Sequence, residues 1–192
     1  MGLYVHSLEN IPKTTNRKYF IYLLDFGWYE PLSQVLNENF AEMAKRASLN
    51  NAVVIKGTEL SHFENEVFSY HSINDEKGTD VLPAILITNQ HPNYFKNNKN
   101  KFHTNEILTK NEDIKLILIP LKKFCKTSTD VVSLIDNLFK DIESNLDLSN
   151  FKIAKENKKD FGKSLYDSIM LEPNVSGIGF NIKKFIENYF KK

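Results

Sequence analysis

The most constraining feature of this chain is a pair of short apolar segments joined by one amphipathic helix. The segments are Tyr19–Leu24 and Ala52–Gly57, and their composition predicts strands that are covered on both faces. From Pro31 onward, apolar residues recur at spacings of three and four and trace one helix face: Leu32, Val35, Leu36, Phe40, Met43, Ala44 and Ala47. We therefore predict a strand–helix–strand unit with parallel strands and right-handed connection, which places the chain in the α/β class.

Further segments extend this unit along the chain. Residues Glu59–His71 predict a second helix, and Val81–Thr88 and Lys115–Pro120 predict two more strands. The run Thr127-Ser128-Thr129-Asp130 is predicted to cap a third helix. The apolar face of that helix consists of Val131, Leu134, Ile135, Leu138, Phe139 and Ile142.

Changes in composition divide the chain into three parts. We predict a polar lead-in at 1–17, with a short pairing segment near Leu3–His6, a core at 18–148 and a C-terminal α/β extension at 149–192. The Asn- and Lys-rich stretch 89–112 predicts a surface insertion in the core. In the extension, Asn181 is a good N-cap for a short apolar helix from about Ile182, which we expect to pack on the core, on a partner or on a second copy.

Composition excludes several classes of function. The 192 residues are 41% hydrophobic and carry 25 basic and 24 acidic side chains, so the net charge of +1 argues against nucleic acid as a partner. No apolar run approaches the roughly 18 residues of a membrane helix, and the N-terminus lacks the pattern of a signal peptide. The single cysteine allows no internal disulfide and indicates a reducing, cytoplasmic location. The abundance of Lys, Asn and Ile indicates an AT-rich, bacterial genome.

The junction between the first strand and its helix carries a resemblance to a known family. Residues Asp25–Leu32 read Asp-Phe-Gly-Trp-Tyr-Glu-Pro-Leu. This run resembles the active-site junction of a thioredoxin, Asp-Phe-Trp…Trp-Cys-Gly-Pro-Cys. When Trp28 and Pro31 are matched to the family, Tyr29 and Leu32 stand in place of the two redox cysteines.

The resemblance implies a fold and excludes the usual reaction. It implies a thioredoxin-like three-layer core with the order β-α-β-α-β-β-α, in which Pro83 would be the cis proline that faces the active-site turn. Because dithiol exchange needs one thiolate to attack and a second thiol to resolve the mixed disulfide, we expect no redox activity at Tyr29 and Leu32. The implied binding groove for an extended partner peptide consists of Trp28, Tyr29, Pro31, Leu82 and Pro83.

These observations predict a redox-inactive protein-interaction or accessory module, with no cofactor and no bound metal, in a bacterial multi-component system. Two enzymes are the alternatives. Tyr29 at a helix N-terminus resembles the thiol-binding tyrosine of a glutathione transferase. Asp80 with Asp113-Ile114-Lys115 resembles the carboxylate and lysine pattern of a metal-dependent nuclease.

Two further sets of residues in the sequence are candidate sites. Cys125 has three lysines close by in sequence that could lower the pKa of its thiol, but a lone cysteine at a strand end is usually a packing residue. His62 precedes Glu64 and Glu66 on the second predicted helix, where side chains two apart point in different directions. That spacing does not favour a metal site.

Overall fold

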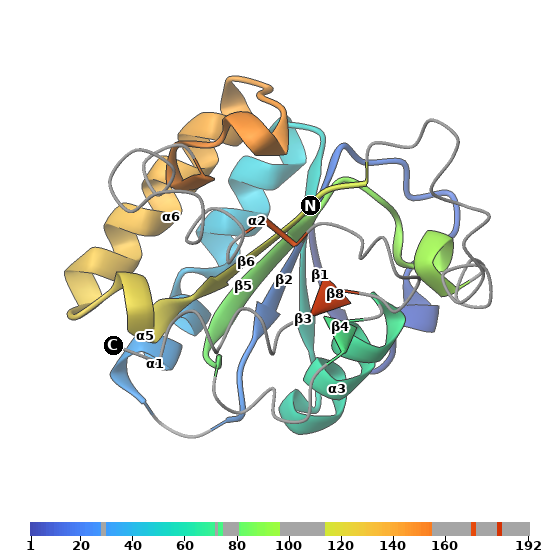
Figure 1. The fold of residues 1–192 in the computed structure, drawn as a ribbon, viewed down its shortest axis with the longest axis horizontal. Helices are drawn as coiled ribbons and strands as arrows, with labels where there is room; N and C mark the ends of the chain where they lie inside the picture. The colour runs from blue at the N-terminus through green and yellow to red at the C-terminus, as the bar shows by residue number, and fades with distance from the viewer. Residues whose placement is uncertain are drawn as a thin grey trace.

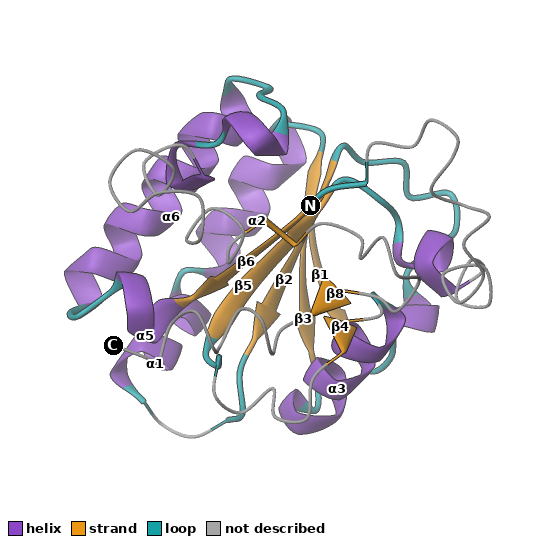
Figure 2. Ribbon diagram, in the orientation of Figure 1, coloured by secondary structure: helices purple, strands orange, loops and turns teal. Residues whose placement is uncertain are grey.

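The protein is a mixed α/β structure in which a twisted central sheet lies between two layers of helix (Figures 1 and 2). The computed structural model describes residues 1–27, 30–71, 73–74, 81–96, 114–154, 170–171 and 180–181. Within these ranges the main sheet has six strands in the order β1-β3-β2-β5-β6-β7.

Three neighbouring strands of the sheet are parallel, and the other three alternate in direction. Strands β1 and β2 both run parallel to β3, whereas β2–β5, β5–β6 and β6–β7 are antiparallel pairs. The strands are β1 (Gly2–Val5), β2 (Tyr19–Leu24), β3 (Ala52–Gly57), β5 (Ala84–Thr88), β6 (Leu116–Pro120) and β7 (Met170–Leu171). A separate parallel pair consists of β4 (Ile73–Asn74) and β8 (Phe180–Asn181).

Helices cover both faces of the sheet, and the two faces have separate cores. Helices α1, α2 and α6 lie on one face and α3 lies on the other (Figure 2). Side chains of β2 alternate between the cores, as strand geometry requires, so that Ile21 belongs to the first core and Tyr22 to the second. The helices are α1 (Pro31–Glu38), α2 (Phe40–Leu49), α3 (Leu60–Tyr70), α5 (Leu121–Phe124) and α6 (Ser128–Glu143), with 3-10 turns η1 (Leu8–Asn10) and η3 (Leu148–Asn150).

The structure confirms the parallel strand–helix–strand unit and places its strands at the predicted residues. The prediction of one unbroken helix after Pro31 is wrong, because α1 and α2 are separated at Asn39. Asn39 has φ −82° and ψ −3°, and its side-chain amide donates to the carbonyl of Val35 at 2.8 Å. A short polar side chain that bonds the local backbone in this way competes with regular helix.

The predicted cap of the last long helix is confirmed. The Thr127 hydroxyl accepts from the Asp130 amide at 3.3 Å, and the Asp130 carboxylate accepts from the Thr127 amide at 2.8 Å. This reciprocal capping box satisfies N–H groups that have no partner inside the helix. The helix ends at Glu143, and Asn145 then adopts a positive φ of 53°.

Both predicted flanking parts contribute strands to the structure. The pairing segment expected near Leu3–His6 is β1, and Leu8 and Ile11 after it are buried in the second core. In the C-terminal part, β7 pairs with β6 and β8 pairs with β4. The helix expected from Ile182 and residues 97–112 of the expected insertion lie outside the described residues. No helix in the described ranges is both long enough and apolar enough to cross a lipid bilayer.

Candidate functional site

The carboxyl ends of the three parallel strands meet at one end of the sheet. Strand β1 ends at Val5, β3 at Gly57 and β2 at Leu24, and Asp25 follows β2 directly. Helices α1 and α3 both begin at this end, on opposite faces of the sheet (Figure 1). In open α/β sheets, ligand sites form outside the carboxyl ends of parallel strands, so this end is the first place to look for a site.

Asp25 organises the polar groups at this end. Its side chain is only 5% exposed. Oδ1 accepts from the Gly27 amide at 3.2 Å and from the Ser33 hydroxyl at 2.9 Å, and Oδ2 accepts from the Asn37 amide at 3.2 Å. Because Ser33 and Asn37 are four residues apart, they lie on the same face of α1. Asp25 therefore connects the end of β2 to the first two turns of α1.

Gly27 allows the chain to turn tightly just after Asp25, where its backbone comes close to the start of α3. Its φ of +79° lies in the left-handed region that side chains disfavour. A Cβ atom at this position would also come within 3.1 Å of Leu60 Cδ1. Both facts make glycine the residue that fits here, with its backbone close to the N-terminus of α3.

A cleft of about 350 Å³ opens beside these residues. Most of the residues that line it have polar side chains, although the surface that they present to the cleft is largely apolar. They come from the β2–α1 junction, α1 and the start of α3: Asp25, Gly27, Ser33, Gln34, Asn37, Glu38 and Leu60. The Gln34 side-chain amide donates to Glu38 Oε1 at 2.8 Å along the same helix face. The volume is within the range of small-molecule sites.

A second carboxyl group is buried close to Asp25. Glu64 lies one turn after Leu60 on α3 and is only 3% exposed. Burial, and to a smaller extent the charge of Asp25, raises the pKa of Glu64 to about 8. Lys56 on β3 is the nearby cation: burial lowers its pKa, and the Asp25 charge acts in the opposite direction. Glu64 is therefore a neutral carboxylic acid near pH 7.

Two further polar groups are buried on the α3 side of the sheet. His71 is on α3's C-terminal boundary, and its ring centroid lies 5.0 Å from that of Tyr22 on β2. Burial lowers the pKa of His71 to about 4 and raises that of Tyr22 well above its ordinary value. Within the described part of the chain, Glu64 Oε2, His71 Nε2 and Tyr22 OH have no hydrogen-bond partner. All three are thus held in their uncharged forms near pH 7.

Two residues of the predicted groove, Trp28 and Tyr29, lie outside the described part of the chain. Pro31 is exposed at the first position of α1, whereas Leu82 and Pro83 are buried, and the peptide bond between them is cis. The pairing of Leu24 with Ala84 brings Pro83 alongside the β2–α1 junction.

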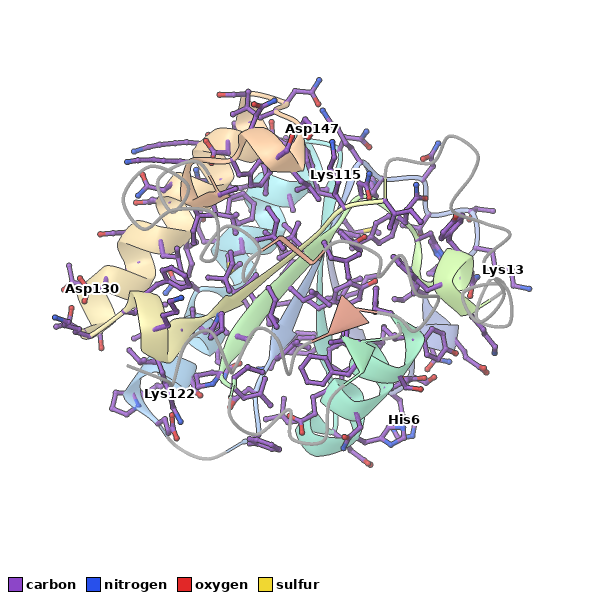
Figure 3. All side chains as sticks on the ribbon, viewed as in Figure 1. His6, Lys13, Lys115, Lys122, Asp130 and Asp147 are labelled. Carbon is purple, nitrogen blue, oxygen red and sulfur yellow. The ribbon has the colours of Figure 1, made fainter. Side chains whose placement is uncertain are left out.

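The chain around the predicted groove is held together at this end of the sheet. The Leu121 amide donates to the Pro83 carbonyl at 2.8 Å. Lys122, labelled at the lower end of the sheet in Figure 3, forms an ion pair of 2.9 Å with Glu30. The β2–α1 junction, the residues before β5 and the residues after β6 are therefore neighbours.

The structure does not support a reactive Cys125. The thiol is buried in the first core, and burial, with a smaller effect of the Asp130 charge, raises its pKa to about 11. The neighbouring lysines therefore do not lower the pKa of this thiol. Such a thiol is protonated near neutral pH and is a poor nucleophile.

Neither alternative metal pattern is assembled among the described residues. Asp80 and Asp113 lie outside them, and Lys115 donates to Asp147 at 2.8 Å at the upper end of the sheet (Figure 3). Glu66 accepts from the Ser7 hydroxyl and the Leu8 amide, away from the buried Glu64. Within the described ranges, no three His, Cys, Asp or Glu side chains are grouped so that they could hold a metal ion.

Sequence reasoning missed most of the cleft. Asp25 belongs to the resemblance only as part of a motif, Ser33 and Asn37 have no predicted role in the sequence, and Glu64 is a candidate only in a metal pattern that its spacing does not favour. One signal was present in the sequence: Glu64 falls between Leu60 and Val67 on the apolar face of its helix. An acidic residue in such a position is buried and needs an explanation. Compared with protein-family models, curated proteins and solved structures, the chain gives no match.

Proposed function

We propose that this protein is a redox-inactive member of the thioredoxin-like superfamily that binds a partner protein as an accessory module. The observation that carries the proposal is the order and direction of the strands. Strands β1, β3 and β2 are parallel, and β5 and β6 follow as an antiparallel pair. This is the arrangement expected of the thioredoxin-like order β-α-β-α-β-β-α.

The absence of cysteine at the junction supports the proposal that the protein is redox-inactive. No thiol is available at Tyr29 or Leu32, and the single cysteine of the chain is buried far along the sequence. A protein with this arrangement has no means of accepting or resolving a mixed disulfide. With one cysteine and no disulfide to maintain, we expect the protein to act in the cytoplasm.

The proposed contact surface is the junction formed by Trp28, Tyr29 and Pro31 together with Leu82 and Pro83. Aromatic residues at such a position supply contact area at a small entropic cost. Within the described part of the chain, no hydrogen bond occupies the backbone of Leu82, so an extended peptide could pair with it. Because Leu82 is 2% exposed, a peptide would have to displace the chain that covers this residue.

The test uses proteins encoded beside this gene as candidate partners, each purified and assayed directly. A Trp28→Ala, Tyr29→Ala double variant should lose binding by tenfold or more, as expected when aromatic anchors are removed (about 10-fold per 1.4 kcal/mol). Tyr4→Ala is the matched control, because Tyr4 is 59% exposed and lies on the edge strand β1. Equal binding by the double variant and the wild type contradicts the groove.

The two enzymes remain as alternatives with simple tests. Saturable binding of glutathione in calorimetry would favour a thiol-binding transferase relative. Divalent metal that raises the melting temperature and permits cleavage of nucleic acid would favour a nuclease. Reduction of insulin faster than by the dithiol alone, and lost in Cys125→Ser, would contradict the redox-inactive proposal directly.

A further inference from the structure

The cleft beside Asp25 has an unusual distribution of donors and acceptors. Asp25 accepts hydrogen bonds from Gly27, Ser33 and Asn37, and Glu38 accepts one from Gln34. A carboxylate only accepts hydrogen bonds, so each of these bonds directs a donor of the lining toward a carboxylate. The Ser33 hydroxyl and one N–H of each side-chain amide are thereby used within the wall, and each amide keeps one further N–H.

The acceptors of the same residues are left over. Each side-chain amide donates one of its two N–H groups to a carboxylate, and the carbonyl oxygens Oε1 of Gln34 and Oδ1 of Asn37 remain as acceptors. Glu38 retains Oε2, and the Ser33 oxygen retains its lone pairs, because its hydrogen goes to Asp25. In the described structure, these oxygens have no hydrogen-bond donor. The cleft thus offers acceptors to whatever enters it.

The charge of the lining also favours a ligand that donates hydrogen bonds. Asp25 and Glu38 both belong to the lining, and neither forms an ion pair within the described ranges. The nearby cation Lys56 has its Nζ 5.7 Å from the ring centroid of Tyr4 on β1 and is not part of the lining. A net negative, acceptor-rich site favours a cation that carries several N–H donors.

A separate observation concerns Glu64, which lies next to the cleft. It lies four residues after Leu60, which lines the cleft, and side chains of a helix tilt toward its N-terminus. The 97% buried carboxyl is therefore carried toward Leu60 and Asp25, and its Oε2 has no partner in the described structure. A protonated carboxyl keeps one carbonyl oxygen as an acceptor, so Glu64 adds an acceptor next to the cleft, although it adds no charge near pH 7 and is not part of the lining.

We propose that the cleft between α1 and α3 binds an ammonium or guanidinium group carried on an aliphatic stem. Asp25, Asn37 and Glu38 receive its N–H donors, and Leu60 packs against the methylene groups of the stem. The cation is either a free alkyl amine or the side chain of a lysine or arginine on a partner protein. The proposal uses only described residues and does not depend on the groove at Trp28 and Pro83.

The probes separate the two sources of the cation. Agmatine represents a free amine, and the tripeptide acetyl-Gly-Lys-Gly-amide represents a side chain. Butane-1,4-diol and acetyl-Gly-Gln-Gly-amide are the uncharged counterparts. Binding is followed on the full chain by calorimetry and by amide NMR shifts, which should be confined to Asp25–Gly27, α1 and the start of α3.

Glu38→Gln is the test variant, because Glu38 is exposed and the substitution removes charge without changing shape. It should weaken binding by about fivefold or more, as expected when a charge-assisted partner is lost. Glu42→Gln removes the same charge from an exposed position one turn further on, outside the cleft lining, and should leave the affinity unchanged. Agmatine should bind more tightly than guanidinium ion, by about threefold to fourfold per buried methylene.

The outcomes are separable. Saturable binding of agmatine or of the lysine peptide, lost in Glu38→Gln and kept in Glu42→Gln, supports the site, and the tighter probe identifies the source. Equal loss in both variants, or equal binding of the uncharged probes, overturns it. The same shifts produced by calcium or magnesium and not by the amines also overturn it, as does the absence of saturation with either cationic probe.

Discussion

Asp25 and Glu64 place two buried carboxyl groups at the same end of the sheet, and the charge of Asp25 contributes to the raised pKa of Glu64. The two carboxyls differ in their partners. Asp25 accepts three hydrogen bonds, whereas Glu64 Oε2 accepts none from the described chain. Hydrogen-bond donors therefore surround the Asp25 carboxyl. The Glu64 carboxyl is buried without such a donor at Oε2, and burial disfavours its charged form.

Glu64→Gln should make the protein more stable at alkaline pH and leave it unchanged at pH 4. The pKa of Glu64 is about 8 in the folded protein and 4.5 when unperturbed, so above pH 4.5 only the unfolded chain ionises. The wild type then loses stability relative to the variant by about 1.4 kcal/mol per pH unit up to pH 8. We expect a difference on the order of 5 kcal/mol at pH 8.5, measured by urea unfolding.

The difference between the two unfolding curves isolates Glu64 from other groups that titrate in this interval, such as Lys123, whose pKa burial lowers to about 7. Glu42→Gln is the control, since it removes an exposed carboxylate and should show no such pH-dependent gain. A gain for Glu64→Gln that is equal at pH 4 and pH 8.5 would show that the carboxyl does not titrate as described.

In contrast to Glu64, His71 should lower the stability of the folded protein as the pH falls. Burial lowers its pKa from 6.5 to about 4, so the unfolded chain takes up a proton at a higher pH than the folded protein. Stability from His71 is complete above pH 6.5 and is lost as the pH falls toward 4, by roughly 1.4 kcal/mol per unit. NMR titration of the His71 ring checks this directly. A midpoint near 6.5 in the folded protein would contradict it.

Asp25→Ala should cost more stability than the loss of any one of its donors. The substitution leaves the Gly27 amide, the Ser33 hydroxyl and the Asn37 amide without their acceptor, and hydrogen bonds to charged groups are worth about 1.5–3 kcal/mol each. We expect a loss of roughly 3–5 kcal/mol in urea unfolding. Ser33→Ala, which removes one donor only, should cost about 1–2 kcal/mol. Equal losses would show that Asp25 does not connect the three groups.

Thr127→Ala should destabilise α6 through its N-terminal cap. The hydroxyl that accepts from the Asp130 amide is lost, which typically costs about 1 kcal/mol. The neighbouring Ser128→Ala is the matched control, because Ser128 is the first helical residue and does not form the cap. Guanidinium unfolding measures both variants, and a larger loss for Ser128→Ala would place the cap elsewhere.

Gly57→Ala should be more damaging than Gly27→Ala. A Cβ on Gly57 would lie 2.2 Å from Phe63 Cβ, a clash with α3 that requires the helix to move. At Gly27 the cost comes from its positive φ and from a 3.1 Å approach to a mobile Leu60 methyl. We expect losses of at least about 3 and about 1–2 kcal/mol respectively. Thermal unfolding of the two variants gives the ranking, and the reverse order would contradict this account.

Local pattern was sufficient to predict the strands and the helix ends with strong chemical signals. β2 and β3 lie at the predicted residues because two-sided burial requires uninterrupted apolar runs. α6 begins at its predicted cap because Thr127 and Asp130 satisfy each other's backbone groups. The strand predicted at Val81–Thr88 starts three residues too early. β5 begins at Ala84, because Pro83 has no N–H to donate to a hydrogen bond between strands.

The cleft was harder to predict because its residues meet only through tertiary structure. Asp25 and Glu64 come from different segments, and their proximity depends on the parallel pairing of β2 with β3, which brings α3 next to the β2–α1 junction. The break at Asn39 was missed for a related reason. The apolar spacing continues through it, and only the side-chain bond to Val35 shows where α1 ends.

Strand β7 has a consequence for how the protein behaves at high concentration. It pairs with Leu116 and Ile117 of β6, whose five residues are all buried. Without this pairing, an apolar stretch of backbone would lie at the border of the sheet with its N–H and C=O groups free, which is a template for aggregation. Residues 170–171 therefore cover this edge at Leu116 and Ile117, and we expect loss of their pairing to increase aggregation of the purified protein.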